Sequence, residues 1–130
     1  MTTFLLDSTA LIAHLRGDET TTRTLLSLLS AGHVLSTTCV NIAEIERGLK
    51  PKDQRRARAL MDRLHFLETT REASRKAGRY QADLRRRGKT LDLADALIAG
   101  TARAHGATVV TENVNDFPMR DVRVRRVRTL

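Results

Sequence analysis

The chain has 130 residues, of which 41% are hydrophobic, and no apolar run reaches the ~18 residues that a membrane helix needs. A single cysteine, Cys39, excludes an internal disulfide and a zinc site built from thiolates, and the 3% aromatic content argues against a base-stacking surface. A formal net charge of +8 predicts a polyanionic partner, which could be nucleic acid, an acidic protein or an anionic membrane surface.

Apolar runs alternate with turn residues along the whole chain. The first half predicts, in order, a strand at Thr2–Leu6, helices at Ala10–Leu15 and Thr20–Ser30, a strand at His33–Thr37, and helices at Val40–Leu49 and Asp53–Leu64. The second half predicts a strand at Phe66–Thr69, helices at Arg71–Arg87 and Leu91–Ala104, and strands at Ala107–Thr111 and Val122–Val127. This alternation predicts one α/β domain over residues 1–130, with three layers and a mainly parallel central sheet. Because Asp7 interrupts the first apolar run, we expect no signal peptide and a cytoplasmic protein.

Four acidic residues stand at positions that favour chemistry over packing. Asp7 directly follows the first strand, and Asp116 follows the strand at Ala107–Thr111, so both can reach the carboxyl edge of the sheet, where open α/β proteins bind ligands. Asp95 lies in a helix that is apolar on nearly every side, where a carboxylate needs a compensating cation or hydrogen bonds. Glu44 lies on the helix Val40–Leu49.

Each of these acids also has a local alternative. Asp7 and Asp116 could cap a helix or form a turn. Asp95 could form a capping box with Asp92, and Glu44 could form an exposed pair with Arg47.

Carboxylates that converge on one cleft repel each other unless a hard cation neutralises them, and oxygen ligands without a Cys or His cluster favour Mg²⁺ or Mn²⁺. An acidic metal site on a basic protein fits a phosphodiesterase, since arginines can hold the substrate backbone beside the metal. The residues alone leave two other interpretations open. One is a non-catalytic basic protein that binds nucleic acid or a partner, and the other is a DNA nuclease.

Four segments together resemble the motifs of PIN-domain ribonucleases of the VapC type, the toxins of type II (VapBC) toxin–antitoxin systems. In chain order these segments are Phe4–Ile12, Asn41–Gly48, Ala94–Ala99 and Val110–Phe117. Each motif alone is weak, but the four occur in order along essentially the whole chain.

The resemblance implies a PIN-like α/β/α sandwich and a metal-dependent endoribonuclease that hydrolyses RNA with a metal-activated water. It implies Mg²⁺ or Mn²⁺ as cofactor, an RNA substrate, a VapB-type antitoxin as partner, and no membrane association. The catalytic and metal-binding positions carry over to Asp7, Glu44, Asp95 and Asp116, and polar substrate-positioning residues to Ser8, Thr111 and Asn113. Two residues depart from the pattern: Gly100 replaces the more common Ala, which weakens a helix, and Glu112 replaces a commonly basic residue.

Two surfaces are candidates for binding. The run Arg85, Arg86 and Arg87, followed by Lys89, leads into the helix of Asp95 and could position RNA phosphates, although the basic tail from Arg120 to Arg128 is an alternative. The residues Leu11, Ile12, Leu15, Leu25, Leu26 and Leu29 exceed what a short helical pair needs for a core. Together with the resemblance, this surplus predicts a homodimer with a groove for an amphipathic partner helix, while plain core packing, with the leucines of Thr20–Ser30 facing inward, is the alternative.

Overall fold

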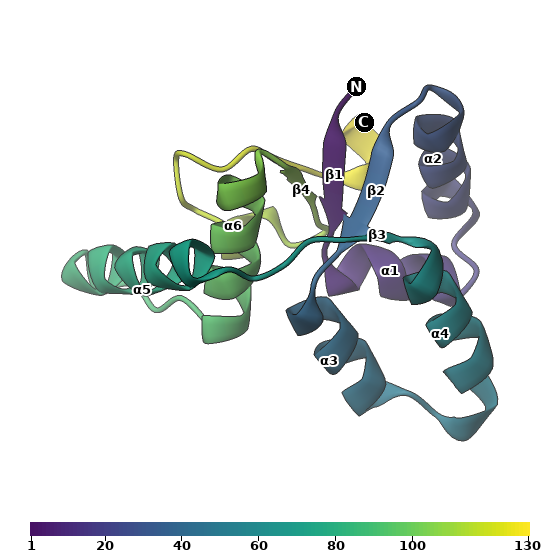
Figure 1. Cartoon of the computed structure of the whole chain (residues 1–130), viewed down its shortest axis with the longest axis horizontal. Coiled ribbons are helices and arrows are strands. Elements are labelled where there is room, and N and C mark those ends of the chain that lie inside the picture. The colour runs from purple at the N-terminus through teal and green to yellow at the C-terminus, as the bar shows by residue number, and fades with distance from the viewer.

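A computed structural model describes all residues, 1–130, as a parallel five-stranded sheet covered by helices on both faces (Figure 1). The strand order is β3-β2-β1-β4-β5, and every neighbouring pair is parallel. The strands are β1 (Thr3–Leu6), β2 (Val34–Thr37), β3 (His65–Phe66), β4 (Thr108–Val110) and β5 (Val124–Arg125). The helices are α1 (Ser8–Leu15), α2 (Glu19–Ser30), α3 (Cys39–Gly48), α4 (Gln54–Arg63), α5 (Arg71–Arg86) and α6 (Leu93–His105). The predicted α/β/α fold is confirmed.

The central strand β1 separates two hydrophobic cores. Leu5 faces the core formed with α5 and α6, whereas Phe4 and Leu6 face the core formed with α1 to α4. Side chains alternate along a strand, so a strand covered on both faces must be apolar at every position. This explains the continuous apolar run at the start of the sequence, and Figure 1 shows α5 and α6 on one side of the sheet with α1, α2 and α4 on the other.

The two outer strands are shorter than expected. The strand predicted at Phe66–Thr69 begins one residue earlier and has only two residues, His65–Phe66. The strand predicted at Val122–Val127 is reduced to Val124–Arg125 and followed by a 3-10 turn. Each lies at an edge of the sheet and pairs on one side only, so few ladder hydrogen bonds hold it.

The expectation that all leucines of α2 face inward is wrong. Leu25 is buried, but Leu26 and Leu29 are 59% and 51% exposed. A helix that packs against a sheet buries one face, and residues three apart share a face. Leu25 and Leu28 therefore contact the core, while Leu26 and Leu29 form a neighbouring face toward solvent.

No helix in the structure combines the length and the apolar character that crossing a membrane would require.

Candidate active site

Asp7 lies at the carboxyl edge of the sheet, where its side chain contacts the hydroxyl groups of two threonines. Its Oδ2 accepts a hydrogen bond from Thr111 Oγ1 at 2.8 Å and one from Thr9 Oγ1 at 3.3 Å. The residue is only 5% exposed, and this burial raises the pKa of the Asp7 carboxyl; Asp116 raises it further, while the threonine hydrogen bonds act in the opposite direction. Asp7 occupies the N-cap position of α1 but forms no side-chain cap, so the capping alternative is wrong.

Glu44 is held by a chain of side-chain hydrogen bonds from the start of α3. Ser8 Oγ donates to Glu44 Oε1 at 2.8 Å, and Asn41 Nδ2 donates to Ser8 Oγ at 3.4 Å. Asn41 is completely buried and is fixed by a capping box in which the Thr38 N–H donates to Asn41 Oδ1 at 3.2 Å and the Asn41 N–H donates to Thr38 Oγ1 at 3.4 Å; Thr38 Oγ1 also donates to Asn41 Oδ1 at 2.7 Å. Glu44 forms no ion pair with Arg47, so the exposed-pair alternative is also wrong.

Asp95 lies half-buried on α6, close enough to the other acids for their charges to act on it. Burial is the largest cause that raises its pKa to about 7, and Asp7, Asp116, Asp92 and Glu44 each raise it further. Asp92 occupies the N-cap position of α6 without a side-chain cap bond, so no capping box forms with Asp95. The four acids singled out in the sequence are thus close enough to interact electrostatically.

Asp116 is exposed, in a 3-10 turn at Val114–Asp116, and it lines a cavity of about 630 Å³ together with Asp95. The other lining residues come from the end of α5, the loop before α6 and the segment after β4: Leu84, Lys89, Thr90, Leu91, Asp92, Asn115 and Pro118. We call this space the acid cavity.

The polar positions beside the acids differ in their roles. Ser8 and Thr111 hydrogen-bond to acids, as expected for residues next to a site. Asn113, in contrast, has an exposed side chain and contributes its backbone N–H, which donates to Thr111 Oγ1 at 3.0 Å. Asn115 lines the acid cavity in its place. Glu112 has an exposed side chain, and its backbone N–H donates to Thr9 Oγ1 at 3.1 Å.

The acids have the donor chemistry of a hard-cation site, although they do not form a closed ligand shell. No three His, Cys, Asp or Glu side chains stand at metal-ligand spacing in this structure. Mg²⁺ keeps several waters and commonly uses only one or two protein carboxylates directly, so a cavity lined by Asp95 and Asp116, with Asp7 and Glu44 outside its lining, fits it. Burial and, after it, the neighbouring acids raise the pKa of Asp95, and a bound cation would lower that pKa.

The three arginines that the sequence suggested for positioning RNA, Arg85, Arg86 and Arg87, have different surroundings in the structure. Arg86 Nη1 forms an ion pair with Asp83 at 2.6 Å. Arg87 lines a cavity of about 210 Å³ beside the acid cavity, and Arg85 is exposed and lines neither space.

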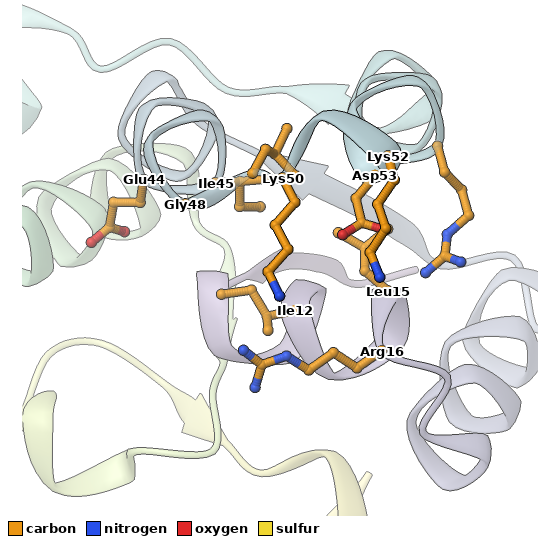
Figure 2. Close-up of a pocket in the computed structure, with 11 residues that line it drawn as sticks. Ile12, Leu15, Arg16, Glu44, Ile45, Gly48, Lys50, Lys52 and Asp53 are labelled. Carbon is orange, nitrogen blue, oxygen red and sulfur yellow. The ribbon is translucent and has the colours of Figure 1, made fainter.

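A separate groove of about 430 Å³ lies between α1, α3 and the connection to α4 (Figure 2). Its apolar part includes Ile12, Leu15 and Ile45, and Lys50 and Lys52 extend toward α1 in Figure 2. Glu44 lines one part of it, so the groove adjoins the acids. The sequence predicts such a groove on the apolar residues of the first two helices. In the structure Ile12 and Leu15 of α1 line the groove, but its other walls come from α3 and the segment before α4 and not from the leucines of α2.

Sequence reasoning missed three residues that support the acids. Thr9 and Asn41 were part of the recognised motifs but had no role, and Asn115 was passed over for Asn113. The spacing of Asn41, three residues before Glu44 on one helix face, was the available signal.

Comparisons of the sequence and of the fold relate this chain to the same group of known proteins. Residues 4–122 match the PIN domain family. Ribonuclease VapC10 from Mycobacterium tuberculosis is 34% identical over 88% of this chain and 86% of that protein, and Ribonuclease VapC19 from the same organism is 28% identical over 88% and 92%. A crystal structure of VapBC2 from Rickettsia felis, bound to a DNA fragment from their promoter, contains a chain with a TM-score of 0.86 at 20% identity, covering 96% of this chain and 98% of that one. The chain belongs to the PIN-domain family, among the proteins of the VapC type.

Proposed function

We propose that this protein is an Mg²⁺- or Mn²⁺-dependent endoribonuclease and the toxin of a toxin–antitoxin pair. The observation that carries the proposal is that Asp92, Asp95 and Asp116 line one cavity of a PIN fold, while hydroxyl groups orient Asp7 and Glu44. A protein that only binds nucleic acid gains nothing from negative charge concentrated where phosphate would lie. The relative named Ribonuclease VapC10 supports the same activity.

In this proposal the side chains of Asp7, Glu44, Asp95 and Asp116 hold the cation. Thr111 and Ser8 orient Asp7 and Glu44 through their hydroxyl groups, and Asn113 fixes Thr111 through its backbone. When bound, Mg²⁺ or Mn²⁺ supplies Lewis acidity toward water and the scissile phosphate. Hydrolysis by water forms a new P–O bond and breaks the bond from phosphorus to the 3′ oxygen, which leaves as a hydroxyl. The products then carry a 5′-phosphate and a 3′-hydroxyl.

The Asp95→Asn variant tests this proposal. The substitution preserves shape but removes a ligand charge, so we expect RNA cleavage to fall by more than the roughly 10- to 100-fold that loss of a supporting residue costs. Asp62→Asn, an exposed aspartate on α4, is the matched control and retains full activity. The measurement is gel analysis of RNA cleavage with Mg²⁺ or excess EDTA, together with mapping of the product ends.

Three results would overturn the proposal: full activity of Asp95→Asn, cleavage that persists in EDTA, or products with 2′,3′-cyclic phosphate ends. The last result would mean that the substrate's own 2′-hydroxyl attacks. Parallel reactions with DNA of the same sequence distinguish a ribonuclease from a DNA nuclease, and intact substrate in every condition would favour a binding protein.

We also propose a VapB-type antitoxin as partner and a homodimer as the functional unit. Solved neighbours of this fold are described as VapBC complexes, from Rickettsia felis and Salmonella typhimurium among others. The groove beside Glu44 has apolar side chains and basic neighbours, including Lys50 and Lys52, and this combination suits an amphipathic segment with acidic residues. Light scattering of the chain alone measures its oligomeric state, and the same measurement after mixing with a candidate antitoxin measures complex formation. A chain that stays monomeric and does not bind the antitoxin contradicts both proposals.

A further inference from the structure

The turn that ends α5 directs the chain into the wall of the acid cavity. Gly88 adopts a left-handed conformation with φ of +75°, its N–H donates to Arg85 O at 2.9 Å, and the N–H of Lys89 donates to Leu84 O at 2.9 Å. These two bonds form a Schellman motif, which ends a helix sharply. Lys89 and Thr90 follow at once and line the cavity that contains Asp95.

The acid cavity adjoins a smaller cavity. The two spaces share Leu84 and Pro118 as lining residues, and the smaller one adds Arg87 and Arg120. Arg87, the C-cap residue of α5, lines the smaller cavity, whereas Arg85 and Arg86 line neither cavity and Arg86 is paired with Asp83. We call the two adjoining cavities together the hollow. Lys89 lies among the acids of the larger cavity, and Arg87 and Arg120 lie with Asp83 and Asp121 in the smaller one.

Ion pairing divides the basic residues around this hollow into two groups. Asp83 pairs with Arg86 at 2.6 Å, and Asp121 pairs with Lys76 at 2.9 Å and with Arg103 at 3.4 Å. In contrast, Arg87, Lys89 and Arg120 are exposed and have no carboxylate partner. Their charges are therefore available to an anionic ligand.

We infer that this hollow binds the phosphodiester backbone of single-stranded RNA next to the scissile phosphate, with Lys89 nearest to the acids and Arg87 and Arg120 farther along. This inference rests on the proposed function and names the residues that hold its substrate. The wall also offers Thr90 and Asn115, whose hydroxyl and amide groups can hydrogen-bond to ribose. Of the three arginines that the sequence suggested together, only Arg87 belongs to the path.

Beyond Arg120, the basic tail contributes Arg123 and Arg125 to a different place in the fold. Arg123 and Arg125 line a different cavity with Met1, Thr2 and Thr108. Met1 and Thr2 precede β1 and Thr108 begins β4, so most of this cavity lies toward the amino ends of the strands, although Arg125 itself pairs with Val110 at the end of β4. A phosphate held there is not adjacent to the acids.

The test is the salt dependence of RNA binding, measured by fluorescence anisotropy with a labelled single-stranded RNA. The protein carries Asp95→Asn so that the RNA stays intact, and Mg²⁺ is present throughout. We expect Lys89→Gln, Arg87→Gln and Arg120→Gln each to weaken binding and to reduce the slope of log K against log salt by about 0.7, the value for one phosphate contact on a single strand. The matched controls are Arg85→Gln, two residues from Arg87 on the same helix, and Arg123→Gln on the tail, and both retain the slope. Thermal unfolding verifies that every variant is folded.

The outcomes separate this inference from the function on which it rests. If RNA binds but Arg85→Gln or Arg123→Gln lowers the slope as much as the three variants of the hollow do, the inference is wrong, because binding then follows general surface charge. The proposed function stands in that case if the wild-type protein still cleaves RNA. If the wild-type protein neither binds nor cleaves RNA, both proposals fail.

Discussion

The four acids at the edge of the sheet fall into two pairs that the protein treats differently. Asp7 and Glu44 each accept hydrogen bonds from hydroxyl groups, at 2.8 Å from Thr111 and at 2.8 Å from Ser8. Asp95 and Asp116 accept none from any side chain, and the pKa of Asp95 rises to about 7. Hydroxyl groups orient two of the acids, although burial still raises the pKa of Asp7, and the other two have no side-chain donor.

This difference indicates that the acids of the proposed site are positioned in two different ways. Hydrogen bonds fix the direction of a carboxylate but also satisfy it, so Asp7 and Glu44 are oriented before a metal binds. Asp95 has only the position of α6 to place it. The geometry of Asp7 and Glu44 should therefore depend on the hydroxyl groups that bind them, and the position of Asp95 should depend on the placement of α6.

Displacing α6 should give the largest effect. Sequence analysis treated Gly100 as a weakness of this helix, but the structure shows that it is required: a Cβ here would clash with Ala73 O and lie 3.2 Å from Ala77 N, both backbone atoms of α5. Because backbone cannot rotate away, we expect Gly100→Ala to push α6 off α5 and to destabilise the protein by about 3 kcal/mol, the upper range for overpacking. The displacement should also lower cleavage by moving Asp95.

Gly78, on α5, is the matched control. A Cβ at Gly78 would meet nothing within 4 Å, so Gly78→Ala should stabilise the protein by about 0.5–1 kcal/mol through its better helix propensity. Urea unfolding of the two variants measures both changes. Equal effects of the same sign would contradict a close approach of α5 and α6 at Gly100.

Removing one hydroxyl group should give the next largest effect. Thr111→Val keeps the shape of the side chain but removes the hydrogen bond to Asp7, which is almost fully buried. We expect metal affinity to fall by about 10- to 100-fold, as for other residues that orient metal ligands. Thr108→Val, on the same strand, is the control because Thr108 is buried and has no side-chain hydrogen bond. Calorimetry with Mn²⁺ measures the affinities, and equal affinities of the two variants would remove the support for an oriented Asp7.

Sequence analysis could identify these acids because their positions follow from local rules. A residue directly after an apolar parallel strand must lie at the carboxyl edge of the sheet, and this places Asp7 whatever the helices do. Gly100 could not be interpreted in the same way, because its role depends on how closely two helices cross. Asn113 and Asn115 differ only in which residue of one turn faces the cavity, and no periodicity determines that choice.

The smallest effect concerns pH, and Asp95, whose pKa rises to about 7, should contribute to it along with Asp7, whose pKa burial also raises. Folding raises the pKa of Asp95 to about 7, whereas an aspartate in an unfolded chain titrates near ~3.9. The folded state thus binds this proton more tightly. Its contribution to stability is complete below about pH 4 and is lost as the pH rises to about 7. Asparagine has no proton to lose, so metal-free Asp95→Asn should lack this decline and melt a few degrees above the wild-type protein at pH 8. Mg²⁺ needs the ionised carboxylate, so the melting temperature it adds to the wild-type protein should grow from pH 5 to pH 8. Thermal unfolding at both pH values, in EDTA and in Mg²⁺, measures these differences. If the wild-type protein and Asp95→Asn show the same pH dependence in EDTA, Asp95 does not contribute to that dependence and its pKa is not raised by folding.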